Sequence, residues 1–183
     1  LDFSQKYSSI LRYFRVFSPE SGEVTLHSRD ELVHMLKEAT HHIITDDEKK
    51  LLLHGLEFAQ KEVRDIMTPR SMIDAVNRSE LLGPLVLDDL HKKGHSRIPV
   101  IESDVDHVVG VLHLRDVLGV DSNRKHTAKV ETAMEPRVFY INERQTLDHA
   151  LTAFIKTHHH LFIVVNEFRE TVGLVTLEDV VEA

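Results

Sequence analysis

The 183-residue sequence contains no cysteine, which excludes a disulfide framework, a thiolate metal site and a thiol nucleophile. It also lacks any apolar run near the ~20 residues that a transmembrane helix needs. The first residues do not show the charged-then-apolar order of a signal peptide. We therefore expect this piece of protein to be soluble and to fold in a reducing compartment, the cytoplasm.

Clusters of basic residues are missing as well. Lysine and arginine are scattered singly, and the formal net charge is −8. A chain without a basic stripe has little with which to neutralise a phosphate backbone, so we expect no nucleic-acid partner. The remaining composition, 42% apolar and 28% charged, is that of an ordinary globular protein with one substantial core or two small ones.

Two phrases of the sequence occur twice. Met67-Thr-Pro-Arg70 returns as Met134-Glu-Pro-Arg137, and Gly110-Val-Leu-His-Leu-Arg-Asp116 returns as Gly173-Leu-Val-Thr-Leu-Glu-Asp179. Both phrases return after about sixty residues, a period that indicates an internal duplication.

Each copy has the hydrophobic pattern of a strand, a helix, two strands and a second helix. In the first copy the expected elements are at 73–76, 80–93, 97–101, 108–112 and from 114 onward. In the second copy they are at 138–141, 146–157, 162–165, 171–175 and from 177 onward. Gly94 is a plausible helix C-cap. A three-stranded unit this small exposes one apolar sheet face, so we expect an α/β fold in which two repeats pack about a pseudo-twofold axis.

The residues before the repeats have a helical pattern. Aromatic and aliphatic residues at spacings of three and four indicate an amphipathic helix over 1–17. Ser28-Arg-Asp-Glu31 and Thr45-Asp-Asp-Glu48 are capping boxes that open helices reaching about Thr40 and Glu62. Because the chain starts without methionine and stops early in its last helix, we expect a longer parent protein. The predicted divisions are a helical region at 1–62, a first repeat at 63–120, a linker at 121–129 and a second repeat at 130–183.

The repeated Gly-to-Asp segment carries the main functional signal. In the second copy Thr176 ends a strand and Asp179 follows within the first helical turn, a spacing that predicts a capping box without any ligand. The same spacing also suits a nucleotide site, because the carboxylate can bind ribose hydroxyls while the helix N-terminus attracts phosphate. In the first copy His113 replaces the threonine, yet Asp116 remains. Without the threonine, helix capping explains Asp116 less well, which favours a ligand role for at least one of the two aspartates.

Together with Arg97-Ile-Pro-Val100, these motifs resemble a tandem CBS-domain pair, or Bateman module. Three phrases are more specific: Ile44-Thr-Asp-Asp-Glu-Lys-Lys50, Val63-Arg-Asp-Ile-Met-Thr-Pro-Arg70 and the stretch 173–182. They resemble the cytosolic part of the CorC/HlyC and CNNM-type magnesium and cobalt transport-associated membrane proteins. The resemblance implies a homodimer on the cytoplasmic side of the cell membrane, with 1–17 as a juxtamembrane helix after an attached transmembrane domain.

The resemblance also implies adenine nucleotide, ATP or AMP and possibly Mg²⁺, bound between the two copies. The implied residues of the first site are Thr68, Ile73, His95, Ser96, Arg97, Ile98, Thr176 and Asp179. The implied residues of the second site are Asp116, Glu135, Tyr140, His160, Leu161 and Phe162. We expect the second site to be weaker, because His113 lacks the hydroxyl and the Glu135 carboxylate would repel phosphate.

Fourteen histidines raise the question of a metal site, especially at 41–42 and 158–160. Neighbouring side chains point apart on a helix or a strand, and no cysteine or spaced carboxylate completes a zinc-like set, so a solvated histidine surface is expected. The sequence has no nucleophile elbow, Walker loop, HExxH or paired-carboxylate motif, and we expect no enzyme.

The favoured hypothesis is thus a regulatory module, in which nucleotide occupancy changes the geometry of a dimer and so modulates the transport (efflux) of Mg²⁺ or Co²⁺ by the membrane domain. The alternative is a ligand-free structural module that dimerises and links a membrane domain to a C-terminal domain. In that case both aspartates would serve only as helix caps.

Overall fold

The computed structural model describes residues 28–39, 44–118 and 128–183. The described residues fall into two compact units, which divide between Glu57 and Phe58. The helix predicted at 1–17 lies outside the described residues. Among the described residues, no helix is both long and apolar enough to cross a membrane.

Both predicted capping boxes open helices. Helix α2 spans Arg29–Glu38, and Ser28 Oγ accepts a hydrogen bond of 3.2 Å from the backbone N–H of Glu31. Helix α3 spans Asp46–Phe58, and its box is reciprocal: Thr45 N donates to Glu48 Oε2 at 2.8 Å and Glu48 N to Thr45 Oγ1 at 3.3 Å. These side chains satisfy backbone N–H groups that the first helical turn leaves free.

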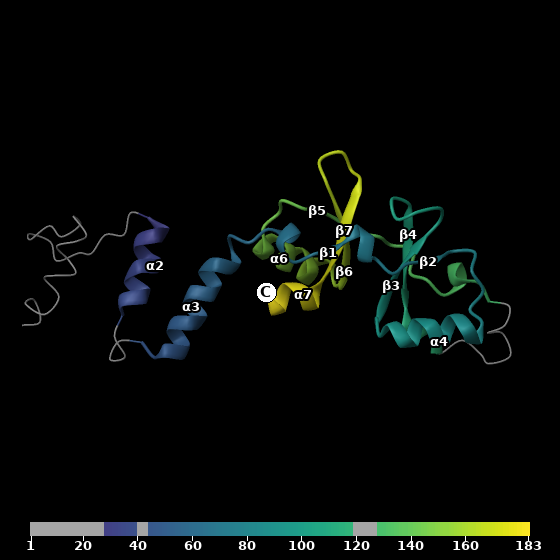
Figure 1. The fold of residues 1–183 in the computed structure, drawn as a ribbon, viewed down its shortest axis with the longest axis horizontal. Coiled ribbons are helices and arrows are strands. Elements are labelled where there is room, and N and C mark those ends of the chain that lie inside the picture. The colour runs from purple at the N-terminus through teal and green to yellow at the C-terminus, as the bar shows by residue number, and fades with distance from the viewer. Residues whose placement is uncertain (1–27, 40–43, 119–127) are drawn as a thin grey trace, which may run out of the picture. The chain divides into compact units, whose positions relative to one another are not determined.

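The second unit contains the two repeats, each ordered strand, helix, strand, strand, helix as predicted (Figure 1). The first repeat comprises β2 (Val76–Asn77), α4 (Pro84–Lys93), β3 (Arg97–Ile101), β4 (Val108–His113) and α5 (Leu114–Leu118). The second comprises β5 (Tyr140–Asn142), α6 (Leu147–Thr157), β6 (Leu161–Val165), β7 (Thr171–Thr176) and α7 (Leu177–Glu182). Short 3₁₀ turns lie at Val63–Asp65, Arg70–Met72 and Val130–Thr132.

Two helix boundaries differ from the prediction because tertiary pairing overrides the local pattern. Helix α3 ends at Phe58 and not near Glu62, since Glu62 forms a β-bridge with Thr146. Helix α4 starts at Pro84 and not at Glu80, because the backbone just before it pairs with the segment that opens the second repeat: Leu82 N donates to Ala128 O at 2.8 Å. Proline is well suited to the first helical position, where no N–H is needed.

Alternation along β6 shows how the cores are divided. Phe162 and Val164 pack with α6 and α7 in the core of the second repeat, whereas Leu161 and Ile163 point to the other face. That other face meets β4 of the first repeat through Val111 in a central cluster. The apolar faces of the two sheets therefore cover each other, as the small size of each repeat predicted.

The repeats also exchange a segment. Strand β1 (Thr68–Pro69) lies within the first Met-x-Pro-Arg phrase and pairs antiparallel with β7 of the other repeat, Thr68 opposite Leu174. The pseudo-equivalent contact is the bridge between Glu135 and Val111, with reciprocal N–H to O distances of 2.9 Å. Each Met-x-Pro segment thus joins the sheet of the opposite copy, which the sequence pattern did not predict.

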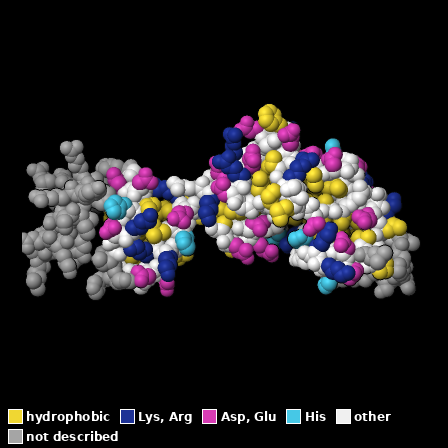
Figure 2. Space-filling model, in the orientation of Figure 1, with side chains coloured by type: hydrophobic (Ala, Val, Ile, Leu, Met, Phe, Trp, Pro, Cys, Tyr) yellow, Lys and Arg dark blue, Asp and Glu magenta, His cyan; other side chains and the backbone are white. Residues whose placement is uncertain are grey.

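The visible surface of the repeats mixes both signs of charge, with hydrophobic side chains among them (Figure 2). Several large apolar side chains are exposed on the second repeat, including Ile155 on α6, 62% exposed, and Val181 on α7, 70% exposed. Single exposed apolar side chains are common on protein surfaces. Ile155 and Val181, however, lie on two helices that contact each other.

Candidate functional site

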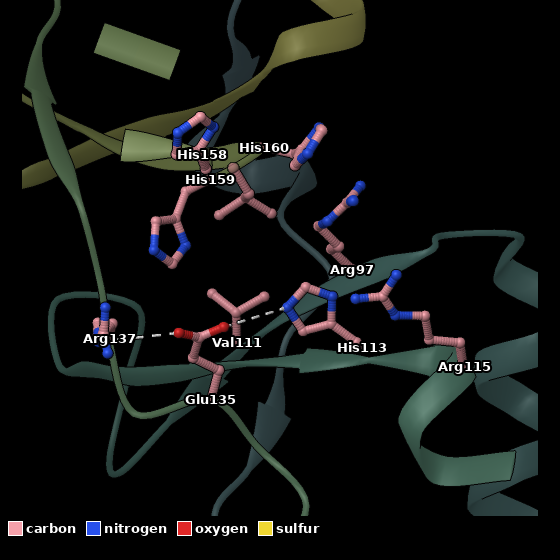
Figure 3. A pocket seen from close by; sticks show the side chains of 10 residues that line it. Arg97, Val111, His113, Arg115, Glu135, Arg137, His158, His159 and His160 are labelled. Carbon is pink, nitrogen blue, oxygen red and sulfur yellow. Dashed lines mark ion pairs between the residues drawn. The ribbon is translucent and has the colours of Figure 1, made fainter. Parts of the chain in front are cut away.

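A cavity of about 160 Å³ lies between the two repeats (Figure 3). From the first repeat its walls are Arg97, Val111, His113 and Arg115, and from the second Glu135, Arg137, His158, His159, His160 and Leu161. Ordinary small-molecule pockets measure roughly 300–1,000 Å³, so a whole nucleotide would extend beyond this cavity. Its dimensions suit a phosphate group or a short chain of phosphates.

Sheet pairing brings the start of one strand beside the end of the next in each repeat. Arg97 at the start of β3 is opposite His113 at the end of β4, and Leu114 N donates to Ser96 O at 3.0 Å. In the second repeat Leu161 is likewise opposite Thr176. In each copy, the first residue of one strand therefore lies next to the end of the following strand, where the helix with the repeated aspartate begins.

The cavity has more positive than negative side chains. Glu135 lies between two of the bases, with Oε2 3.8 Å from His113 Nε2 and Oε1 4.0 Å from Arg137 Nε (Figure 3). Arg97 has no ion pair or hydrogen bond among the described residues, and its Nε is buried without a partner. A buried donor without a partner is costly, so this N–H group is free to bind an acceptor that enters the cavity.

Two histidines of the pocket have lowered pKa values. Burial is the main cause for both His113 and His160, and the neighbouring Arg97 charge lowers each pKa further. Both effects disfavour the charged imidazolium, so the neutral form gains at the expense of the cation near neutral pH.

The Thr176 and Asp179 pair forms the capping box that one interpretation of the sequence predicted. Asp179 Oδ2 accepts from Thr176 N at 2.8 Å and from Thr176 Oγ1 at 2.7 Å, while Asp179 N donates to Thr176 Oγ1 at 3.2 Å. The other carboxylate oxygen, Oδ1, makes no hydrogen bond within the described chain. In the first repeat, Asp116 Oδ1 instead lies 3.5 Å from Arg115 Nε. The cap therefore leaves one oxygen of Asp179 for a ligand.

The other residues predicted for the first site are dispersed. Thr68 pairs with Leu174, just before the Thr176 cap, whereas Ser96 and Arg97 lie against the helix start of their own repeat. His95 Nε2 is 3.2 Å from Asp74 Oδ2. Ile98 is buried in the first repeat's core, and Ile73 packs against the central cluster.

The cavity combines residues of both predicted sites: Arg97 was predicted for the first site, and Glu135, His160 and Leu161 for the second. Tyr140 Oη donates to Val108 O at 3.4 Å. Phe162 is buried in the core of the second repeat, so only its backbone could contact a ligand.

Sequence reasoning missed Arg115, Arg137, His158 and His159 as pocket residues. The signal for Arg137 was present, because it ends the second Met-x-Pro-Arg phrase just as Arg70 ends the first. The histidine run 158–160 lines the cavity, and His158 and His160 are also exposed to solvent, as expected. Among the described residues, no group of three or more potential ligands could hold a metal ion.

A second link between the repeats involves Asp106 in the β3–β4 hairpin. Arg70 donates to both carboxylate oxygens of Asp106, and its Nη1 donates to Thr171 O at 2.9 Å. Thr171 N, at the start of β7, donates to Asp106 Oδ1 at 2.9 Å. The Arg70 bond and then the Thr171 bond lower the pKa of Asp106 to about 2.

Replacing Asp106 by Asn is expected to lower Tm at pH 7 by about 2–4 °C, equivalent to about 1 kcal/mol. The pKa shift alone would give about 2.6 kcal/mol, but the Asp106 side chain is 36% exposed and solvent screens the pair. A lowered folded pKa stabilises above the unfolded pKa of about 3.9 and loses this effect as pH falls toward 2. Thermal unfolding between pH 7 and 2 checks this.

Asp104→Asn is the matched control, because Asp104 Oδ1 bonds His107 and Asp106 within its own hairpin and does not contact the second repeat. Its effect on Tm should be smaller. A difference between Asp106→Asn and the wild type that is as large at pH 2 as at pH 7 would contradict the assignment.

Comparison with known proteins gives consistent matches. The family model for the CBS domain matches residues 63–123 and 130–183. The magnesium and cobalt efflux protein CorC of Salmonella typhimurium is 32% identical over 156 residues, which is 85% of this chain and 53% of that protein. CorC of Vibrio cholerae is 35% identical over 155 residues, 84% of this chain and 53% of that protein. The chain thus spans about half the length of these curated relatives.

Solved structures match over most of the repeats. The CBS domain of the bacterial CNNM/CorC family Mg²⁺ transporter is 33% identical, with a TM-score of 0.76, and covers 86% of this chain and 95% of that one. The same domain in complex with ATP is 33% identical, with a TM-score of 0.69 over 74% and 95%. A CBS-domain pair with bound AMP from Klebsiella pneumoniae is 25% identical, with a TM-score of 0.57 over 66% and 95%.

Proposed function

The chain belongs to the CBS-domain family, as a tandem pair of the CorC/CNNM type, and we propose that it is a regulatory module that binds an adenine nucleotide between its repeats. The observation that carries the proposal is the positive cavity between the repeats, in which Arg97 Nε is buried without a partner. A CNNM/CorC domain has been solved with ATP and a more distant CBS pair with AMP, and both support the ligand class.

In this proposal different charged side chains bind different parts of the nucleotide. Arg97, Arg115 and Arg137 contact phosphates, because charge-assisted hydrogen bonds from guanidinium groups suit their oxygens. Asp116, or Asp179 at the pseudo-equivalent site, accepts hydrogen bonds from the ribose hydroxyls. Magnesium would arrive with the triphosphate, since phosphate oxygens supply ligands that the described part of the chain does not bring together.

The wider role follows from the relatives, of which this chain covers about half. We propose that the parent protein has a membrane domain that exports Mg²⁺ or Co²⁺, with the module on the cytoplasmic side. The module would dimerise, and nucleotide occupancy would bias the dimer between two geometries with different transport activity. Exposed Ile155 and Val181 on the neighbouring helices α6 and α7 support a helical dimer contact.

The second candidate function is a structural module without a ligand. The reciprocal capping box of Thr176 and Asp179 favours it, because the two side chains satisfy each other without a nucleotide. Sedimentation separates the two functions: a structural module forms a dimer whose shape is indifferent to ATP, whereas the regulatory module changes shape on binding.

Calorimetric titration with ATP, ADP and AMP, with and without Mg²⁺, tests the proposed function directly. We expect Arg97→Ala to weaken ATP binding at least about tenfold, because a hydrogen bond to a charged group contributes about 1.5–3 kcal/mol. Asp179→Asn retains an oxygen for the Thr176 cap but removes the charge, so it separates a ribose role from a capping role.

Arg144→Ala is the control, since Arg144 pairs with Glu167 at 2.8 Å and does not line the cavity. It should bind ATP as the wild type does. The proposal fails if no adenine nucleotide binds at millimolar concentration, or if Arg97→Ala binds ATP with unchanged affinity.

A further inference from the structure

Four histidines converge on the cavity from two elements of different repeats. His113 ends β4, and His158, His159 and His160 form the turn between α6 and β6 (Figure 3). The His159 ring packs against Phe139, with 4.3 Å between the ring centroids. The imidazoles of His113 and His160 can change the charge of the cavity with pH, which the arginines cannot.

The charged groups that act on His113 and His160 come from several structural elements. Those of His113 are Arg97 on β3, Arg115 and Asp116 on α5 and Glu135 before β5. Those of His160 are Arg97, Arg115, His159 and, on α7, Glu178. For both histidines, burial is the largest influence on the pKa and the repulsion from Arg97 is the largest charge effect, so each loses its proton more readily than a free histidine.

An anion in the cavity would reverse this balance. Phosphate oxygens beside Arg97 neutralise the repulsion and attract a proton to each imidazole. If the bound anion raises the affinity for protons, then protons must raise the affinity for the anion by the same factor.

We propose that protons are co-ligands of this cavity: phosphate groups bind together with protons taken up by His113 and His160, so affinity rises as pH falls from about 8 to about 6. The inference rests on the proposed function for the identity of the ligand and adds its regulation. The module then responds jointly to nucleotide and to pH.

The experiment is calorimetric titration of the 183-residue chain at pH 8 and pH 6, with ATP and with inorganic tripolyphosphate as probes. Two buffers with different protonation enthalpies report the number of protons taken up per ligand bound. We expect net proton uptake and a rise in affinity of at least about tenfold, since each linked proton contributes up to a factor of ten per pH unit.

The double variant His113→Gln with His160→Gln is expected to lose proton uptake by the protein and most of the rise. Phosphate itself titrates near pH 6, but this contribution is common to wild type and variant and cancels in the comparison. His149→Gln is the control, because His149 lies on α6 and does not line the cavity. It should keep the full pH response.

Circular dichroism shows whether the double variant is folded; if it is not, the two single variants decide, each losing part of the rise. A double variant, or both single variants, with the same pH response as the wild type overturns the inference while the proposed function stands. Binding of ATP by the wild type without proton uptake would also overturn the inference and leave the proposed function in place. If neither probe binds at either pH, the proposed function itself fails.

Discussion

Replacing Gly173 by Ala is expected to destabilise the repeats by about 3 kcal/mol, the upper part of the range for overpacking a filled site. A Cβ at this position would lie 2.5 Å from Thr68 O and 2.8 Å from Met67 Sδ. The Met67 side chain can move, but Thr68 O is backbone and belongs to β1, which pairs with β7 at this point. Strand β1 would have to separate from the sheet of the opposite repeat.

Urea unfolding of the variant measures this loss. Gly110→Ala should behave in the same way, since its Cβ would lie 2.6 Å from Glu135 O at the pseudo-equivalent contact. Gly83→Ala is the matched control, because the nearest atom is Leu81 O at 4.0 Å, and its cost should stay below about 1 kcal/mol. Wild-type stability for both Gly173→Ala and Gly110→Ala would show that the exchanged segments are not tightly packed in solution.

Replacing Phe154 by Ala is expected to cost about 3–5 kcal/mol, the usual loss for a buried phenylalanine. Phe154 is 2% exposed and its ring stacks on Phe162, with 4.1 Å between centroids and 11° between planes. Its loss opens a cavity between α6 and β6. Because His160 and Leu161 directly precede Phe162, the start of β6 at the pocket should loosen as well.

Thermal and urea unfolding check the stability, and ATP titration of the folded fraction checks the pocket. Lys156→Ala is the matched control: the residue lies on the same helix but is exposed and makes no ion pair or hydrogen bond through its side chain among the described residues, so the change should stay within about 0.5 kcal/mol. Equal losses for the two variants would contradict the assignment of Phe154 to the core.

The elements that local pattern predicts well are those whose signals lie within a few residues. The side chains of Ser28 and Thr45 cap their helices by accepting hydrogen bonds from backbone N–H groups three residues further on, and Gly94 takes the left-handed conformation, φ 73°, that ends α4. His158 occupies the same conformation, φ 56°, at the end of α6, where no glycine announces it. The end of α3 was predicted too late because Glu62 forms an isolated β-bridge with Thr146, more than eighty residues away in sequence, which no local pattern contains.

The residues of the site were likewise predicted only in part. The prediction named Arg97, Glu135 and His160, which all line the cavity, but it divided them between two sites, Arg97 in the first and the other two in the second. The expected repulsion by Glu135 did not allow for His113 and Arg137 beside it, at 3.8 Å and 4.0 Å. Charges from separate segments combine only once the fold has brought them together.

The sequence by itself determined that the protein is duplicated, which residues cap its helices and which strand positions face a core, because each of these depends on neighbours or on a period along the chain. The tertiary structure decided that each Met-x-Pro segment joins the opposite sheet and that Arg97, His113 and His160 surround one cavity. Those contacts form only when the two sheets pack face to face. The cavity that remains between the repeats contains Arg97, whose Nε has no partner.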